Sequence, residues 1–352
     1  MKLFTVGPVE ISEDIRQCGG AQIPYFRTPE FSAIMMDIEA TFNELVHAPA
    51  DSRLITLTAS GTGAMEAVVE NLLTNKDKAL VINGGSFGQR FVELCQRFEI
   101  PFSQLKLEYG QVLTMELLAP YEDQGYSALL VNLHETSTGQ LYDGWMLGKF
   151  CERNHMLYIA DVISTLFADP FDMAAMGINA VICSSQKALA LPPGLAFIVV
   201  DQIAQERIAC ANVPSMYFDL KDYLKNMERG QTPFTPAVGI IMQLQLQLKE
   251  MQAKGIDTIV DVHAKRAAYF RQLCAQNHIT VAGFPKSNAL TTIEFPDGNA
   301  YDIFLYMKDK HGIMLTPSGG SLSGRLLRVG HLGNLTLQDY DQVVEYLKEV
   351  MQ

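Results

Sequence analysis

The sequence predicts an α/β fold, with a mostly parallel sheet covered by helices and a smaller C-terminal α/β domain. Between residues 54 and 200, short apolar runs alternate with amphipathic stretches, a pattern typical of parallel strands joined by helices. The chain has 352 residues, of which 48% are hydrophobic. That length suggests roughly two domains of ~150 residues each. Beyond residue 200, longer helical stretches precede a few shorter strands, which favours a second, smaller domain.

In the first part of the chain, each expected strand is a short apolar run that ends in turn residues or small polar residues. The expected strands are Leu54–Thr58, Ala79–Asn83, Phe102–Leu107, Ala128–Asn132, Leu157–Ala160, Ala180–Ser184 and Ala196–Val200. Helical spacing of apolar residues lies between most of them. The expected helices include Ala64–Leu73, Gln89–Phe98 and Met146–His155.

The second part of the chain begins with helices. A helix is expected over Leu220–Arg229, and residues 230–236, rich in proline, break the chain. Helical spacing continues over residues 240–251, and a further helix, Thr258–Gln276, leads into the second domain. The remaining expected elements are strands near Thr280 and at Leu290–Phe295, Ile313–Thr316 and Leu326–Val329, with helices at Ala300–Lys310 and Thr336–Met351.

Composition excludes several classes of function. The net charge of -12 and the lack of a basic stripe argue against a nucleic-acid partner. No apolar run approaches the ~20 residues of a membrane span. The 6 cysteines form no CxxC pair and are expected to be reduced thiols in a cytoplasmic protein. The 7 histidines show no paired spacing, so no metal site is expected.

Four strand ends carry residues that could perform chemistry. Residues 58–67 form a glycine-containing loop that leads into a helix, which suits an anion or is simply a tight turn. Hydroxyl-rich residues 132–139 could bind a ligand oxygen or cap a turn. Asp161 closes a buried strand and needs a partner, either a helix N-terminus or a protonated ring nitrogen. Lys187 follows the next strand, where its amine could attack a carbonyl or simply lie at the surface.

Taken together, these groups match what pyridoxal 5'-phosphate requires. The glycine loop suits its phosphate, the carboxylate its pyridinium nitrogen and the lysine its aldehyde. Here the chain resembles the class V aminotransferases of fold type I, in the branch of alanine–glyoxylate and serine–pyruvate aminotransferases. The matching stretches are Gly7-Pro8, Ser60–Gly63, Gly85–Arg90, Glu135–Gly139, Asp161, Ser185–Ala188 with Pro192–Gly194, and Leu327–Gly330.

The resemblance implies a role for each cofactor-binding residue. Lys187 would form the Schiff base and shuttle a proton, and Asp161 would keep the ring nitrogen protonated. Thr136 would lie near the phenolic oxygen, and Phe87 would stack on the ring where many relatives have tryptophan. The residues expected at the phosphate are Thr62, Gly63, Ala64 and Gln186.

The resemblance also implies substrate and partner contacts. Arg328 would grip the substrate carboxylate, whereas an ion pair would be its purely structural role. Gly7 lies in the segment expected over the substrate. Thr232 or Thr235 would reach the phosphate of a partner subunit, which implies a homodimer with shared active sites.

Three ranges divide the chain on this basis. Residues 1–14 form an N-terminal segment over the active site, 15–250 the large cofactor-binding domain, and 251–352 the small C-terminal domain. Arg27 also lies in a stretch that matches the family, but the sequence assigns it no firm role. His331 could reach the substrate or serve the structure.

The expected activity is a ping-pong transfer of an amino group. The donor would be a small amino acid or amine, and the acceptor a 2-oxo acid such as pyruvate or glyoxylate. The alternatives are a 2-aminoethylphosphonate–pyruvate transaminase, a pyridoxal-phosphate-dependent lyase or desulfurase, and a non-catalytic protein on the same fold. The desulfurase is disfavoured because residues 317–325, before Arg328, contain no cysteine to act as nucleophile.

Overall fold

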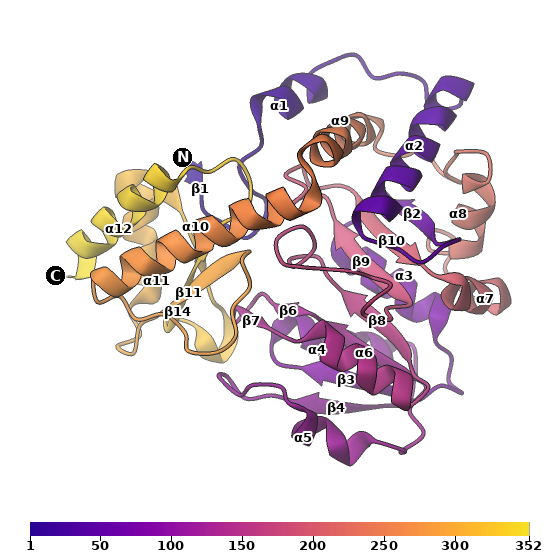
Figure 1. Ribbon diagram of the computed structural model, residues 1–352, viewed down its shortest axis with the longest axis horizontal. Helices are drawn as coiled ribbons and strands as arrows, with labels where there is room; N and C mark the ends of the chain where they lie inside the picture. The colour runs from indigo at the N-terminus through magenta and orange to yellow at the C-terminus, as the bar shows by residue number, and fades with distance from the viewer. Residues whose placement is uncertain (352) are drawn as a thin grey trace.

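A central sheet of seven strands organises the larger part of the molecule, as the computed structural model of residues 1–351 shows (Figure 1). The strand order is β2-β10-β9-β8-β5-β3-β4. All neighbours run parallel except β10, which is antiparallel to both β2 and β9. The strands are β2 (Arg53–Leu57), β3 (Ala79–Asn83), β4 (Phe102–Lys106), β5 (Ala128–Asn132), β8 (Leu157–Asp161), β9 (Ala180–Ser184) and β10 (Ala196–Val200). The predicted α/β class and all seven predicted strands are confirmed.

The apolar side chains of this sheet are buried on both faces. In β5, Leu129 and Val131 belong to one hydrophobic cluster, whereas Ala128 and Leu130 belong to another on the opposite face. This alternation explains why the strands are apolar throughout and not at every second residue. The first cluster is covered by α2 (Pro29–Leu45), α6 (Gly144–Arg153) and α9 (Val238–Lys254), and the second by α3 (Gly61–Leu72), α4 (Ser86–Arg97), α7 (Gln202–Cys210) and α8 (Leu220–Met227).

Three predicted helices begin earlier than the apolar spacing suggested. Helix α3 starts at Gly61 instead of Ala64, α4 at Ser86 instead of Gln89, and α6 at Gly144 instead of Met146. Each first turn contains glycine, which has poor helix propensity and no side chain to report the period. Capping decides two of these starts, because Ser60 accepts from the Gly63 amide and Asp143 from the Met146 amide.

Two helices lie before residue 54, where none was predicted. Helix α1 (Glu13–Gly19) packs on α9. The start of α2 has a clear local signal, with Thr28 as the N-cap and Pro29 in the first turn. Helices α9 and α10 (Ile256–Gln276) are separated by Gly255, whose φ of 79° suits glycine.

The C-terminal part is built on a three-stranded antiparallel sheet. Its strands are β11 (Leu290–Glu294), β14 (Leu326–Gly330) and β13 (Thr316–Pro317), in that order, and α10, α11 (Ala300–His311) and α12 (Leu337–Met351) pack around them. The predicted strand Ile313–Thr316 is wrong as one element. Its first half, β12 (Ile313–Met314), pairs with the N-terminal β1 (Lys2–Leu3), so the chain turns into a second sheet at Leu315. The predicted strand near Thr280 is only a single bridge between Val281 and Ile293.

A third hydrophobic cluster fills this C-terminal part. It includes Phe270 of α10, Leu327 of β14, Val343 of α12 and also Phe4 from the N-terminus. The start of α10 packs on the core of the large sheet instead, through Ile256 and Ile259. Helix α10 thus runs from one core to the other (Figure 1). The division of the chain at residues 14 and 250 stays a prediction.

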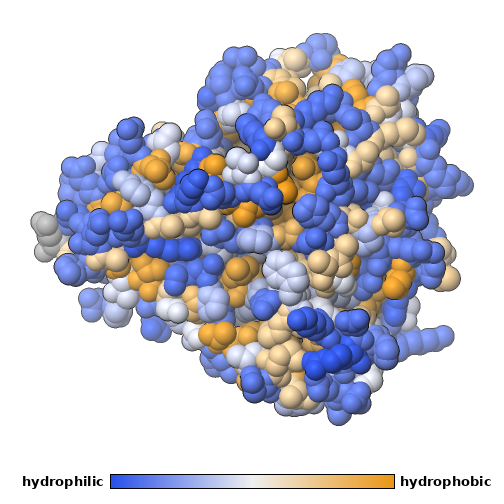
Figure 2. Space-filling view, in the orientation of Figure 1, coloured by the Kyte–Doolittle hydropathy of each residue, from blue (hydrophilic) through white to orange (hydrophobic). Residues whose placement is uncertain are grey.

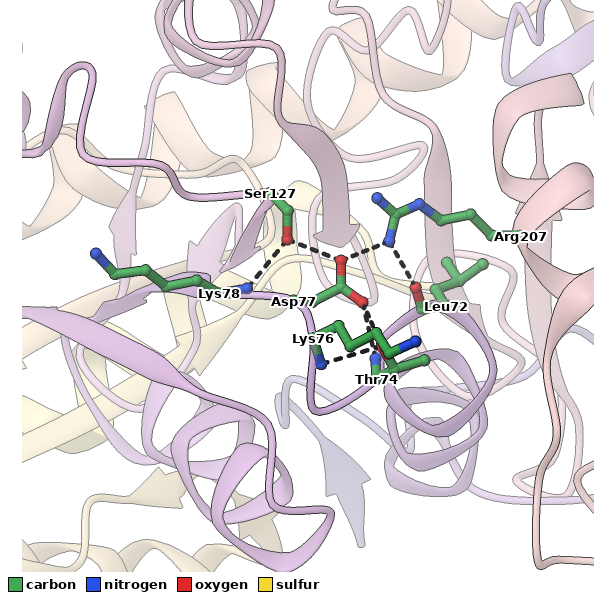
Figure 3. Close-up of polar contacts among 7 residues, drawn as sticks. All are labelled: Leu72, Thr74, Lys76, Asp77, Lys78, Ser127 and Arg207. Atoms are coloured by element: carbon green, nitrogen blue, oxygen red, sulfur yellow. Dashed lines mark hydrogen bonds and ion pairs between the residues drawn. The ribbon is translucent and has the colours of Figure 1, made fainter.

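The amino edge of the large sheet is closed by a polar cluster around Asp77 (Figure 3). One oxygen of Asp77 accepts from Ser127 Oγ at 2.8 Å and Arg207 Nη1 at 2.9 Å. The other accepts from the backbone amide of Thr74 at 2.8 Å. Ser127 precedes β5 and Asp77 precedes β3, so the cluster fixes the starts of both strands. The carboxyl ends of the parallel strands lie at the opposite edge.

The surface drawn in Figure 2 is mostly hydrophilic, and its apolar residues lie in small separate groups. Within residues 1–351, no helix combines the length and apolar character needed to cross a bilayer.

Candidate functional site

The predicted site residues gather at the carboxyl edge of the large sheet. Asp161 ends β8, and Lys187 comes three residues after the end of β9, the strand beside it. Ser60 follows β2, Phe87 follows β3 and Thr136 follows β5. Because these strands are parallel to one another, their carboxyl ends open on one side, where ligands of such sheets bind.

Asp161 is a buried carboxyl group with one strong hydrogen bond. Its Oδ1 accepts from the Ile163 amide at 2.8 Å, and the residue is 5% exposed. Burial raises the pKa of Asp161 to about 7, although the Ile163 amide and the nearby Lys187 amine act in the opposite direction. A cation placed against this carboxyl would therefore be strongly favoured.

Lys187 lies in an environment that makes its amine easier to deprotonate than that of an ordinary lysine. Burial and, to a smaller extent, the nearby Arg328 lower its pKa to about 8, and Asp161 acts in the opposite direction. Gly7 covers the lysine, since a β-carbon at position 7 would lie 2.7 Å from Lys187 Cδ and 2.8 Å from the Gln186 carbonyl oxygen. The N-terminal segment thus lies against Lys187 and Gln186.

The glycine loop forms the first turn of α3. Ser60 Oγ accepts from the Gly63 amide at 3.4 Å, and a β-carbon at Gly61 would collide with Ile163. Ala64 is buried, and its amide is already hydrogen-bonded within the helix, because it donates to the Ser60 carbonyl at 3.2 Å. Thr62 and Gly63 are the residues that face outward, because each is partly exposed.

Arg90 joins this loop, although the sequence assigned it no role. Its Nη1 donates to Thr62 Oγ1 at 2.7 Å, and its guanidinium lies 5.0 Å from the centre of the Phe87 ring. The predicted helix began at Gln89 and left Phe87 outside it. In α4, which begins at Ser86, Phe87 and Arg90 are three residues apart and therefore lie on one face.

Glu135 is a second residue that sequence reasoning missed. Its fully buried carboxylate accepts from the amides of Phe87 at 3.3 Å and Gly88 at 3.0 Å, and from Ser137 Oγ at 2.5 Å. Helix α4 has no cap from its own N-cap residue, Gly85. Glu135 supplies that cap from the neighbouring strand end and so fixes the position of Phe87.

Thr136 lies in a buried polar chain. Its hydroxyl contacts Ser164 Oγ at 2.7 Å, and Ser164 Oγ contacts His134 Nδ1 at 3.0 Å. Burial lowers the pKa of His134 to about 3, helped by the charges of Lys187 and Arg328, so the imidazole is neutral. The carbonyl of Thr136 accepts from Arg328 Nη1 at 2.6 Å.

Arg328 links the strand ends to the C-terminal sheet. Its Nη2 donates to the Pro317 carbonyl at 3.0 Å, and its buried Nε has no partner within residues 1–351. Burial lowers the pKa of Arg328 to about 10. A guanidinium has five N–H groups, so three of them have no partner within residues 1–351. With Phe87, Ser137 and the loop 319–322, Arg328 lines a cavity of about 610 Å³. A hollow of about 680 Å³ beside α6 contains none of the predicted site residues.

The two candidate threonines lie in the proline-rich segment of residues 230–236, the proline loop, and differ in their surroundings. Thr232 is buried, and its hydroxyl donates to the Phe234 carbonyl at 2.7 Å, whereas Thr235 is exposed. Arg27 holds the loop, because its Nη1 donates to Gln231 Oε1 at 3.0 Å and to the Thr232 carbonyl at 2.8 Å. The position of Arg27 thus indicates a role in shaping the loop.

His331 has a structural position. It is fully buried, and its Nε2 contacts Thr291 Oγ1 at 2.8 Å. Its ring packs against Phe270 and Tyr340. For metals, no group of three His, Cys, Asp or Glu side chains within residues 1–351 could hold an ion.

Comparisons with known proteins show the family to which this chain belongs. The sequence model described as "Aminotransferase class-V" matches residues 25–332. A protein of Synechococcus sp. (strain PCC 6716) named soluble hydrogenase, small subunit, is 31% identical over 99% of this chain and 92% of its own length. The L-aspartate–glyoxylate aminotransferase of Paracoccus denitrificans (strain Pd 1222) is 25% identical over 95% of this chain and 87% of its own length.

A solved structure agrees over the whole chain. The crystal structure of an aspartate aminotransferase of subgroup IV from Thermus thermophilus superposes with a TM-score of 0.92 at 27% identity, covering 99% of this chain and 100% of that one. The fold is therefore that of the fold type I aminotransferases, the enzyme is a transaminase, and its family implies pyridoxal phosphate as cofactor. The chain belongs to the class V aminotransferase family.

Proposed function

We propose that this enzyme uses pyridoxal phosphate to move an amino group from a small amino acid or amine to a 2-oxo acid, such as pyruvate or glyoxylate. The two half-reactions would follow each other in a ping-pong order. The observation that carries the proposal is the pair Asp161 and Lys187, at the ends of the neighbouring strands β8 and β9.

The residues present fit this cofactor. Within residues 1–351, the buried Asp161 carboxyl forms no ion pair, and its pKa is raised. A protonated pyridine nitrogen beside it would stabilise the ionised carboxylate and lower that pKa. The partly exposed Thr62 and Gly63 at the N-terminus of α3 suit a phosphate, and Gln186 lies beside Lys187 to support it. When bound, pyridoxal phosphate supplies a conjugated ring that accepts the electrons left when the substrate's α-C–H bond breaks.

Lys187 would hold the cofactor's aldehyde carbon and move a proton. With a pKa of about 8, its amine is neutral often enough near neutral pH to act as nucleophile and base. Gly7 covers the lysine, which excludes water from that side. Thr136 would donate to the phenolic oxygen, and Phe87 would stack on the ring.

Arg328 would orient the substrate through its α-carboxylate. Arg328 lines the same cavity as Phe87, and a guanidinium can bind a carboxylate through two parallel hydrogen bonds. By their names, the Paracoccus relative is an aspartate–glyoxylate aminotransferase and the Thermus protein an aspartate aminotransferase, which supports an amino-acid donor. The 2-aminoethylphosphonate–pyruvate transaminase, the lyase and the desulfurase remain alternatives for the test below.

We also propose a cytoplasmic homodimer with shared active sites. The proline loop presents the exposed Thr235 on a segment that Arg27 holds in place, which suits contact with a second chain. Exposed apolar side chains, Ile23, Tyr25 and Met216, offer further area for such a contact. All six cysteines are free, as expected for a reducing compartment.

A half-reaction screen tests the proposal. The enzyme loaded with pyridoxal phosphate would be mixed with alanine, serine, aspartate or 2-aminoethylphosphonate, and its visible absorption would be followed. We expect at least one amino acid to convert the bound cofactor to its pyridoxamine form, and Lys187→Ala to abolish the conversion. A protein that does not bind pyridoxal phosphate would refute the proposal. Conversion by 2-aminoethylphosphonate alone would favour the phosphonate alternative, and release of a product without pyridoxamine formation would favour the lyase or desulfurase.

A further inference from the structure

Arg90 is a cation without a carboxylate partner at the edge of the proposed cofactor site. Its side chain is half-buried, and within residues 1–351 no Asp or Glu oxygen lies within ion-pair distance of it. Two other half-buried arginines have such partners, Arg53 with Glu39 at 2.8 Å and Arg207 with Asp77 at 2.9 Å. The half-buried Arg27, Arg266 and Arg271 have none, but each donates to at least one backbone carbonyl. Within residues 1–351, the one hydrogen bond of Arg90 goes to Thr62 Oγ1. An unpaired guanidinium that is partly removed from water is best satisfied by an anion.

The contact between Arg90 and Thr62 fixes the direction of the threonine hydroxyl. A guanidinium has only donors, so Thr62 Oγ1 must accept the hydrogen bond that Arg90 Nη1 makes at 2.7 Å. The hydroxyl proton of Thr62 is therefore left to donate elsewhere. Thr62 lies in the first turn of α3, where the free backbone amides also attract negative charge.

The same guanidinium touches the wall on which the cofactor ring would stack. It lies 5.0 Å from the centre of the Phe87 ring, which is one helical turn earlier in α4. Glu135 caps α4 through the amides of Phe87 and Gly88, so this turn is fixed in place. Arg90 therefore connects the phosphate end of the site with its aromatic wall.

We propose that Arg90 is a further cofactor-binding residue, which supplies positive charge to the phosphate of pyridoxal phosphate and turns the Thr62 hydroxyl into a donor toward it. The proposal rests on the proposed function, because it names the group that the cofactor's phosphate would meet. It makes a specific demand: Arg90 should matter for pyridoxal phosphate and much less for pyridoxal, which lacks the phosphate.

The test compares both ligands on four proteins. Wild-type enzyme, Arg90→Lys, Arg90→Met and Thr62→Val would be stripped of cofactor by dialysis and titrated with pyridoxal phosphate and with pyridoxal, following visible absorption. Because hydrogen bonds to charged groups are strong, we expect Arg90→Met to raise the Kd for pyridoxal phosphate by about 10- to 100-fold. The Kd for pyridoxal should change by less than about threefold, since only stacking through Phe87 is altered. Arg90→Lys keeps the charge but not the planar fork, so its loss should be smaller.

A double variant tests the route through Thr62. If Arg90 orients Thr62, the combined loss in Arg90→Met with Thr62→Val should be smaller than the product of the single losses. Equal weakening of both ligands in Arg90→Met, or no weakening of either, would overturn the proposal. If Arg90→Met does not fold, Arg90→Lys and Thr62→Val carry the same comparison. Wild-type enzyme that binds neither ligand would instead refute the proposed function.

Discussion

The side chain of Lys187 lies directly beneath Gly7, so close that a β-carbon at position 7 would be 2.7 Å from Lys187 Cδ. Gly7 also has a φ of 140°, which side chains other than hydrogen rarely allow. Two segments 180 residues apart in sequence thus meet at the proposed reactive amine. This contact makes position 7 sensitive to any added atom.

We therefore expect Gly7→Ala to lower kcat/KM for transamination by about 100-fold, because a displacement of the reactive group by about 1 Å has that scale of effect. The matched control is Gly283→Ala, because no heavy atom lies within 4 Å of a β-carbon built at Gly283. That variant should keep full activity. Steady-state kinetics with the donor found in the half-reaction screen would measure both, and full activity in Gly7→Ala would contradict the proposed overlap.

Asp161 should determine the reaction but not the fold. Asp161→Asn keeps the shape of the side chain and removes the charge that would hold a proton on the ring nitrogen. We expect the half-reaction with an amino acid to slow by about 1000-fold or more, a cost of about 4 kcal/mol. Stopped-flow absorption would measure it. An unchanged rate would show that no carboxylate is needed at this position.

The same variant predicts a pH dependence of stability in cofactor-free protein. Burial raises the pKa of Asp161 to about 7, above the ordinary value of 3.8. Its contribution is thus fully present below about pH 4 and is lost as the pH rises through 7, by about 1.4 kcal/mol per pKa unit. Asp161→Asn has no such loss, so its melting temperature should rise relative to that of the wild type between pH 4 and pH 8. A difference that stays constant over this range would contradict the raised pKa.

Substitution of the two threonines of the proline loop should have different effects. Thr235→Val should weaken pyridoxal phosphate binding by about 10-fold if its hydroxyl reaches the phosphate in a partner subunit. Thr232→Val removes an internal hydrogen bond to the Phe234 carbonyl, so it should lower the free energy of unfolding by about 1 kcal/mol. Cofactor titration and urea unfolding distinguish the two effects. The reverse assignment would place Thr232 at the phosphate.

The Asp77 cluster should affect stability without affecting the cofactor. Asp77→Asn weakens the bonds from Arg207, Ser127 and Thr74 at the edge of the sheet that lies away from the site. We expect a loss of about 2 kcal/mol in urea unfolding and an unchanged Kd for pyridoxal phosphate. Glu250→Gln, in the exposed pair with Lys254, is the control and should cost under about 0.5 kcal/mol.

The stability contributed by the Asp77 cluster should depend on pH. Burial alone would raise the pKa of Asp77, but the hydrogen bonds from Arg207, Thr74 and Ser127 outweigh it and lower the pKa below 3.8. The stabilisation is therefore present above about pH 4 and is lost as the pH falls through the lowered value. Asp77→Asn should differ most from the wild type near neutral pH and least in acid. An equal difference at all pH values would contradict this.

Sequence by itself determined the sheet and the strand ends. Apolar runs separated by helical spacing identified all seven strands of the large sheet, because a strand buried on both faces must be apolar throughout. Asp161 and Lys187 could be placed at neighbouring strand ends for the same reason. The predicted starts of three glycine-containing helices were wrong by two or three residues, since glycine has no side chain that contributes to the helical spacing of apolar residues.

Only the tertiary structure decided which distant groups meet. Gly7 lies on Lys187, Glu135 caps the helix that carries Phe87, and Arg90 binds Thr62. The run at residues 313–316 reads as one strand, but it is divided because its first half pairs with the N-terminal β1. Local patterns record how each segment buries its own side chains. Contacts between segments depend on how helices and strands pack together, which no single stretch of sequence records.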